Sequence, residues 1–86
     1  MNQIQLVGRL DRADMYMVRA RKAWEGGDRF TAEQYILLCK REYQPLESAA
    51  PLAWKHLERR LQQLCADILK ADVNLRLTAS ISSNLL

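Results

Sequence analysis

The sequence predicts an all-α protein, either a small three-helix bundle or a helical hairpin followed by a long third helix, with a flexible C-terminal tail. Three observations support this prediction. Apolar residues recur at intervals of three and four along three segments, which is typical of helix faces that pack on a core. Three glycines and two prolines are too few for a loop-rich or all-β fold. The 86 residues suit a single domain that spans 1–86.

The first helix is expected over about 9–25. Its apolar seam consists of Leu6, Leu10, Ala13, Met17, Ala20 and Trp24. Because glycine costs about 1 kcal/mol relative to alanine inside a helix, Gly8 favours a start near Arg9. Gly26 and Gly27 are expected to end this helix, since glycine adopts the left-handed C-cap conformation without steric cost.

The second helix is expected over about 32–44. Thr31 and Gln34 have the spacing of a capping box, in which each side chain bonds the other residue's backbone N–H. The apolar seam continues through Ile36, Cys39, Tyr43 and Leu46. Pro45 lacks a backbone N–H and disfavours helical geometry at Gln44, so it predicts a break or kink.

The third helix is expected over about 51–71, with Pro51 in its first turn. Its seam is formed by Trp54, Leu57, Leu61, Leu64, Ile68 and Ala71. In the remaining residues, 72–86, apolar and polar residues alternate from Val73 to Ile81, which is typical of a strand. A lone strand would need a partner's sheet edge. The Ser, Thr and Asn content favours instead a frayed helix extension or a disordered tail.

The composition is that of an ordinary globular protein. A net charge of +3 is a weak indication of a polyanionic partner. Cys39 and Cys65 lie on apolar helix stripes, which predicts two buried thiols rather than a disulfide. No signal peptide is recognisable at the N-terminus, and no window is apolar enough for a membrane span. These features predict a cytoplasmic protein.

The sequence contains no arrangement of residues that is typical of an enzyme, a cofactor site or a metal site. His56 is the only histidine, and Glu58 lies on another face of the same helix. The two cysteines are far apart in sequence, whereas zinc sites need paired ligands at short spacing. The stretch 26–28 follows a helix and precedes no lysine, unlike a phosphate-binding loop. We therefore expect a non-enzymatic protein without cofactors.

A basic face on the third helix supports an alternative function. Lys55, Arg59 and Arg60 lie close together on this helix, as in helical proteins that read DNA. Glu58 and Asp67 interrupt this positive face. Nucleic-acid binding by a small regulatory protein is therefore the second hypothesis, behind protein binding.

Protein binding is favoured by a surplus of apolar residues. Three helices can satisfy one another's seams in a bundle. Further apolar positions widen the first two helices, namely Met15, Tyr16, Val18, Tyr35, Leu37 and Leu38. They either enlarge the core or form an exposed patch for another helix. Self-association through the heptad-like seams, as a homodimer, is a further alternative.

Part of the chain also resembles a known family. The matching stretches are GGD, QY, RE and LESA, at 26–28, 34–35, 41–42 and 46–49. Over residues 20–50 they resemble the helical hairpin of the small co-chaperones that guard needle subunits in bacterial type III secretion. The chain departs from that pattern at residues 29–33, at Pro45 and in its long third helix.

The resemblance implies a function without enzymatic activity. Members of that family pair with a chaperone of tetratricopeptide type, and together the two keep the needle subunit monomeric in the cytoplasm. The subunit's amphipathic helix would polymerise if its apolar face were free. By position, the resemblance implies that Tyr35, Leu38 and Leu46 contact the partner, and their alternative role is core packing.

Overall fold

The computed structural model describes the backbone of residues 1–85 and the side chains of residues 1–71. Its elements are α1 (Gln3–Glu25), α2 (Arg29–Tyr43), α3 (Leu46–Ala49) and α4 (Pro51–Leu85). No strand occurs among residues 1–85, so the predicted all-α class is confirmed. The short helix α3 was not expected from the sequence.

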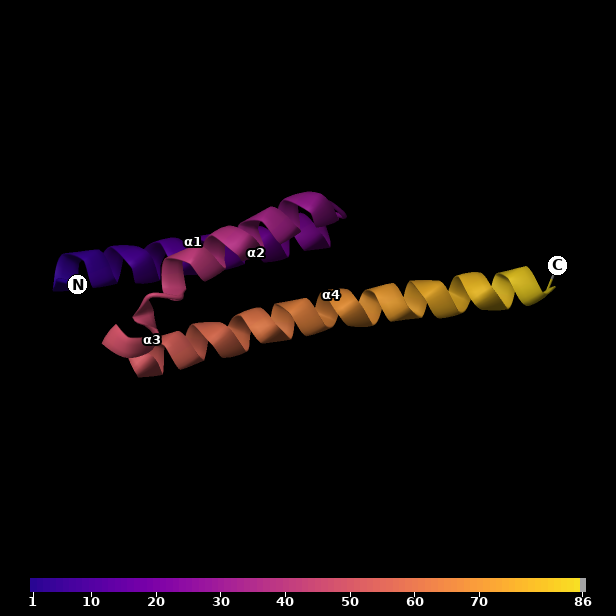
Figure 1. Ribbon diagram of the computed structural model, residues 1–86. Helices are drawn as coiled ribbons and strands as arrows, with labels where there is room; N and C mark the ends of the chain where they lie inside the picture. Colours follow the sequence, from indigo (N-terminus) through magenta and orange to yellow (C-terminus); the bar gives the residue numbers. More distant parts are fainter. Residues whose placement is uncertain (86) are drawn as a thin grey trace.

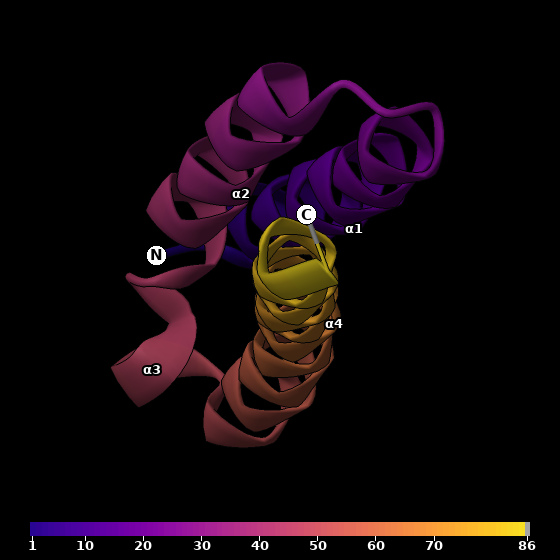
Figure 2. The same cartoon turned by 90° about the vertical axis from the view of Figure 1, so that its right-hand side faces the viewer.

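The helices form a hairpin with a long helix lying along it. Figure 1 shows α1 and α2 side by side in opposite directions, with α4 running beneath both of them. Viewed end-on in Figure 2, α1, α2 and α4 lie at the corners of a triangle, and α3 sits to one side. The molecule is elongated, with extents of 62 × 20 × 13 Å, because α4 continues well past the corner of the hairpin.

The core lies inside this triangle, and the predicted seams supply it. The buried cluster consists of Ala13, Met17, Ala20, Ile36, Cys39, Tyr43, Leu46, Leu57, Leu61, Leu64 and Ile68. Small residues of α1 face the larger side chains of α2 and α4, so the helices can approach closely. The spacing of three and four therefore predicts correctly which face of each helix is buried.

α1 begins earlier than the expected start near Arg9. The Asn2 side chain accepts a hydrogen bond from the Gln5 backbone N–H at 2.8 Å. The Gln5 side chain accepts one from the Asn2 backbone N–H at 3.2 Å. Such a cap contributes about 1 kcal/mol and offsets the similar cost of Gly8 inside the helix.

The corner between α1 and α2 is formed by Gly26, Gly27 and Asp28. Gly27 has φ +83°, the left-handed conformation that glycine adopts most easily. The Gly27 N–H donates to the Trp24 carbonyl, and the Asp28 N–H donates to the Ala23 carbonyl. These two bonds are a Schellman motif, so the predicted glycine stop is confirmed.

The capping box predicted at Thr31 and Gln34 is wrong, because α2 starts earlier than expected, at Arg29. Asp28 is its N-cap: the carboxylate accepts from the Thr31 backbone N–H at 3.1 Å and from the Thr31 hydroxyl at 2.6 Å. These two bonds lower the pKa of Asp28, because they favour the charged carboxylate. Asp28 thus ends one helix with its N–H and begins the next with its side chain.

Pro45 separates α2 from the short helix α3, so the predicted break is confirmed. α4 starts at Pro51, as expected, and continues through Leu85. The expected end at Ala71 and the strand alternative are therefore wrong, the helix extension is observed in the backbone, and the flexible tail is not confirmed. The physical reason is that no glycine or proline follows Pro51 to stop the helix.

Candidate partner-binding groove

An open apolar groove runs between α2 and α4. It has a volume of about 480 Å³. Its lining residues are Ile36 and Leu37 from α2 and Cys65, Ile68 and Leu69 from α4, with Arg29 and Glu33 at the edge. Leu37 is 58% exposed and Leu69 is 64% exposed, although both are large apolar side chains. We call this feature the α2–α4 groove.

The groove follows from pairs of adjacent apolar residues on each helix. Neighbouring residues of an α-helix point about 100° apart. Ile36 and Ile68 are buried in the core, so Leu37 and Leu69 turn toward solvent. The two isoleucines form the floor of the groove, and the two leucines flank it. The result suits the apolar face of an added helix.

One edge of the α2–α4 groove carries charge. The Arg29 Nε donates to the Glu33 Oε1 at 3.0 Å, across one turn of α2. Both side chains are about half exposed. Exposed pairs of this spacing contribute only about 0.3–0.5 kcal/mol, so this pair adds little to the stability of the fold.

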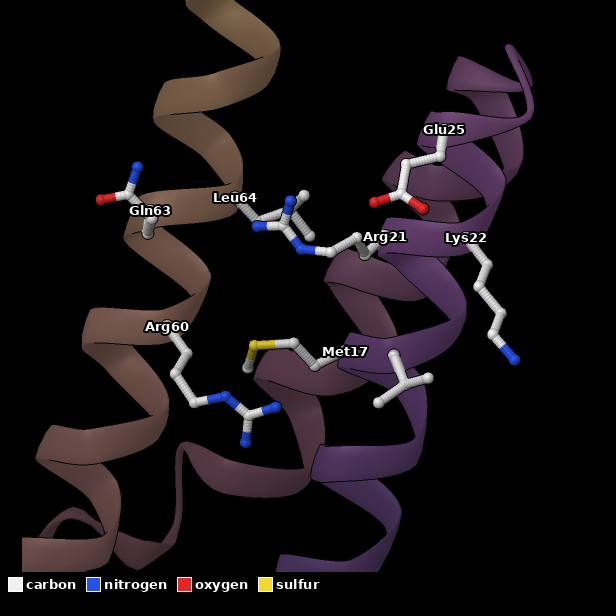
Figure 3. A pocket seen from close by; sticks show the side chains of 8 residues that line it. Met17, Arg21, Lys22, Glu25, Arg60, Gln63 and Leu64 are labelled. Atoms are coloured by element: carbon white, nitrogen blue, oxygen red, sulfur yellow. The ribbon is translucent and has the colours of Figure 1, made fainter.

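The opposite flank of α4 also has a groove, of about 380 Å³, but charged side chains cross it (Figure 3). Arg21 of α1 pairs with Asp67 of α4 at 3.3 Å. Arg60 of α4 pairs with Asp14 of α1 at 2.6 Å. Figure 3 shows Arg21 and Arg60 reaching into the space between the helices from opposite sides. An apolar helix entering there would have to displace these ion pairs.

The structure does not gather Tyr35, Leu38 and Leu46 into one surface. Tyr35 is half-buried and stacks on Tyr16 of α1, with ring centroids 6.1 Å apart. The Arg19 guanidinium lies 6.0 Å from the centre of the Tyr35 ring. The position of Tyr35 therefore indicates a role in holding α1 against α2.

Leu46 is fully buried in the core, so the expectation that it contacts a partner is not compatible with its position. Leu38 is partly exposed and lines a shallow hollow together with Leu37 and Arg41. None of the three candidates is among the residues that line the α2–α4 groove. Sequence reasoning noted Leu37 as a surplus apolar residue but did not assign the groove to it.

The three cations of the predicted basic face also differ in their surroundings. Lys55 and Arg59 are exposed. Arg60 is turned toward α1, where Asp14 neutralises it. Glu58 lies between them in sequence and accepts a hydrogen bond from the Tyr43 hydroxyl. Of these three cations, only Lys55 and Arg59 therefore remain available to a nucleic-acid backbone, and they do not form a continuous positive face.

Burial changes the acidity of two side chains in the core. It raises the pKa of the Cys39 thiol to about 11. It also raises the pKa of Tyr43, to which the hydrogen bond with Glu58 adds. Both groups are therefore neutral near pH 7, and neither is prepared to act as a nucleophile or a base.

Within the described part of the chain, no three His, Cys, Asp or Glu side chains lie close enough to hold a metal ion. The same residues contain no helix with the length and hydropathy that a bilayer crossing requires. Comparisons with models of known families, with curated proteins and with solved structures give no match to this chain.

Proposed function

We propose that this protein is a non-enzymatic protein-binding module that covers the apolar face of an amphipathic helix in another protein. The observation that carries this proposal is the α2–α4 groove, where Leu37 and Leu69 remain exposed beside a buried floor. Two parallel walls of helix suit a third helix that lies lengthwise between them.

The energetics favour apolar contacts over charged ones. Burying a leucine side chain contributes roughly 1.5–3 kcal/mol, before the cost of association is subtracted. Leu37 and Leu69 are therefore the expected main contributors to binding. Arg29 and Glu33 lie at the edge, where charges affect the orientation and rate of binding more than its strength.

The resemblance of residues 20–50 to type III secretion co-chaperones gives this module a biological role. In that role the groove keeps an aggregation-prone needle subunit monomeric in the cytoplasm, together with a chaperone of tetratricopeptide type. The subunit's helix would lie with its apolar side against Leu37 and Leu69, which prevents the same side from polymerising.

A matched pair of variants tests the proposal. Leu37→Ser with Leu69→Ser removes apolar surface from the groove. Leu52→Ser removes a leucine that is 84% exposed at the start of α4, outside the groove. Each chain is expressed in the native host, and co-purifying proteins are identified by mass spectrometry.

We expect one helical protein to co-purify with the wild type and with Leu52→Ser, and to be lost from the groove variant. A purified complex of the wild type should then show the partner helix protected from hydrogen exchange. The proposal is wrong if the groove variant retains the same partner, or if the wild type purifies without any.

A further inference from the structure

The final part of α4 projects from the molecule. Among residues 1–71, whose side chains the structure describes, Ile68 is the last member of the buried cluster, and α4 continues to Leu85. At 1.5 Å per residue the helix beyond Ile68 is roughly 25 Å long. Figure 1 shows this part extending past the hairpin corner, with none of the other described helices beside it.

The composition of this projecting part is unusual for a helix surrounded by water. Between 73 and 85 the sequence VNLRLTASISSNL has one charged residue, Arg76, and six apolar residues. Solvated helices normally carry many charges, and most helices in proteins need packing to be stable. A continuous helix of this composition therefore calls for a surface that covers it.

The projecting part cannot cover itself by folding back. α4 is one unbroken helix, and Cys65 and Leu69 of the same helix form a wall of the α2–α4 groove. A return into that groove would need a break, and no glycine or proline follows Pro51. Residues 73–85 therefore do not reach the α2–α4 groove of their own chain.

We propose that the end of α4, residues 73–85, docks in the α2–α4 groove of a second copy of this chain, and that the docking is reciprocal. The groove lies next to the hairpin corner, since its lining includes Arg29, which begins α2, and Leu69, which follows Ile68 on α4. The end of α4 leaves the molecule past this same corner. Two copies that meet corner to corner with antiparallel α4 helices place each end on the other's groove.

The lengths and the chemistry agree with this arrangement. The α2 side of the groove runs from Arg29 to Leu37, about 12 Å, so residues 73–85, roughly 20 Å long, are long enough to fill it. The groove is mainly apolar, and the segment that would fill it carries six apolar residues and a single charge. Antiparallel exchange of one element by each copy gives a closed two-fold dimer without a free end.

The dimer does not require the partner of the proposed function, but the two use the same groove. A groove that is filled by a second copy is hidden until a partner helix displaces it. Binding of a partner helix and self-association are therefore mutually exclusive at this surface.

Three full-length variants test the dimer. The end variant carries Leu75→Gln, Leu77→Gln and Ile81→Gln, because glutamine keeps helix propensity while removing apolar surface. The groove variant carries Leu37→Glu and Leu69→Glu, both at exposed positions that the fold tolerates. Leu52→Glu is the control, at an exposed leucine outside the groove. Circular dichroism checks the helix content of each, and sedimentation velocity over a range of concentrations measures association.

We expect the wild type and the control to form dimers. The end variant and the groove variant should each dimerise more weakly by about tenfold or more, as expected when buried leucines are lost. An equal mixture of the two variants has one intact end and one intact groove, so it should associate more strongly than either variant alone.

A wild type that stays monomeric at high micromolar concentration would overturn the dimer, as would an end variant that dimerises as well as the wild type. A mixture that associates no better than its components would overturn reciprocal docking. If the variant with Leu37→Ser and Leu69→Ser loses a partner that co-purifies with the wild type, while the wild type itself is monomeric, the dimer fails and the proposed function stands.

Discussion

The thiol of Cys39 donates a hydrogen bond to the carbonyl oxygen of Ala13, 3.3 Å away, and so connects α2 to α1 inside the core. Both residues are completely buried. The alanine leaves room for α2 to approach the α1 backbone closely enough for this bond. The contact therefore depends on a small residue in one helix and a small polarizable one in the other.

The two cysteines should react at very different rates. Cys65 is partly exposed in the α2–α4 groove, while burial raises the pKa of the Cys39 thiol to about 11. At pH 8, and at a concentration low enough to keep the chain monomeric, we expect a thiol reagent to modify Cys65 in the folded protein and Cys39 only after addition of denaturant. Mass spectrometry of the labelled chain checks this, with Cys65→Ser as the control that leaves no fast site.

Stability should fall in mildly alkaline solution. An unfolded cysteine loses its proton near pH 9, whereas folded Cys39 does so only near pH 11. Between these values the unfolded state binds fewer protons than the folded state, so the free energy of unfolding decreases as pH rises. The raised pKa of Tyr43 acts in the same direction above pH 10. Urea unfolding from pH 8 to 11 measures the decrease in the free energy of unfolding. In the Cys39→Ala variant this decrease should be smaller below pH 10, before Tyr43 contributes.

Leu46→Ala should destabilise the fold rather than weaken only a surface contact. Leu46 is fully buried although it lies in the four-residue helix α3. Loss of a buried leucine costs about 2–5 kcal/mol of unfolding free energy. Thermal or urea unfolding measures this, and Leu52→Ala at an exposed site should change stability by less than about 0.5 kcal/mol. Equal effects of the two changes would contradict the buried position of Leu46.

Two glycine substitutions should change the free energy of unfolding in opposite directions. Gly27→Ala places a side chain at φ +83°, which costs roughly 1–2 kcal/mol. Gly8→Ala removes a glycine from the interior of α1 and should stabilise by about 0.5–1 kcal/mol. The added methyl group at position 8 approaches the end of the flexible Arg12 side chain, which can move. Unfolding free energies of both variants, measured side by side, test the assigned conformations.

The ion pairs between α1 and α4 should be weak. Arg60 and Asp14 are each more than a third exposed, so water and salt screen their attraction. A double-mutant cycle with Arg60→Gln and Asp14→Asn should give a coupling of about 0.2–1 kcal/mol that shrinks at 1 M salt. A coupling that persists at high salt would show instead that this pair is shielded from solvent.

Local signals in the sequence predict much of the fold. Pro45 stops α2 because it lacks the backbone N–H that would continue the helix. The start of α1 could not be placed as well, since the bonds between Asn2 and Gln5 compete with the cost of Gly8. The end of α4 was misplaced because alternation of apolar and polar residues is compatible with a helix when no stop signal follows.

The groove is formed by tertiary packing and could therefore not be predicted from the sequence. Leu37 and Leu69 are far apart in the chain, and each also fits a wider core stripe. Only the packing of α4 against α2 decides that both remain exposed side by side. Leu46 is the opposite case, because the resemblance suggested it as a partner contact and the structure buries it in the core. Apolar pairs such as Ile36 with Leu37 are the local signal that could have indicated the groove.

Asp28 belongs to both helices of the hairpin, because its N–H bonds the end of α1 and its carboxylate bonds the start of α2. There is no spare residue in this corner to absorb a change in chain length. A one-residue insertion there that preserves the first contacts would rotate the whole of α2 by about 100° about its axis. Ile36 would then take the place of Leu37 at the groove, and Tyr35 would turn inward. The length of the corner thus determines which residues of α2 face the α2–α4 groove. Substitutions can change that surface without rotating α2.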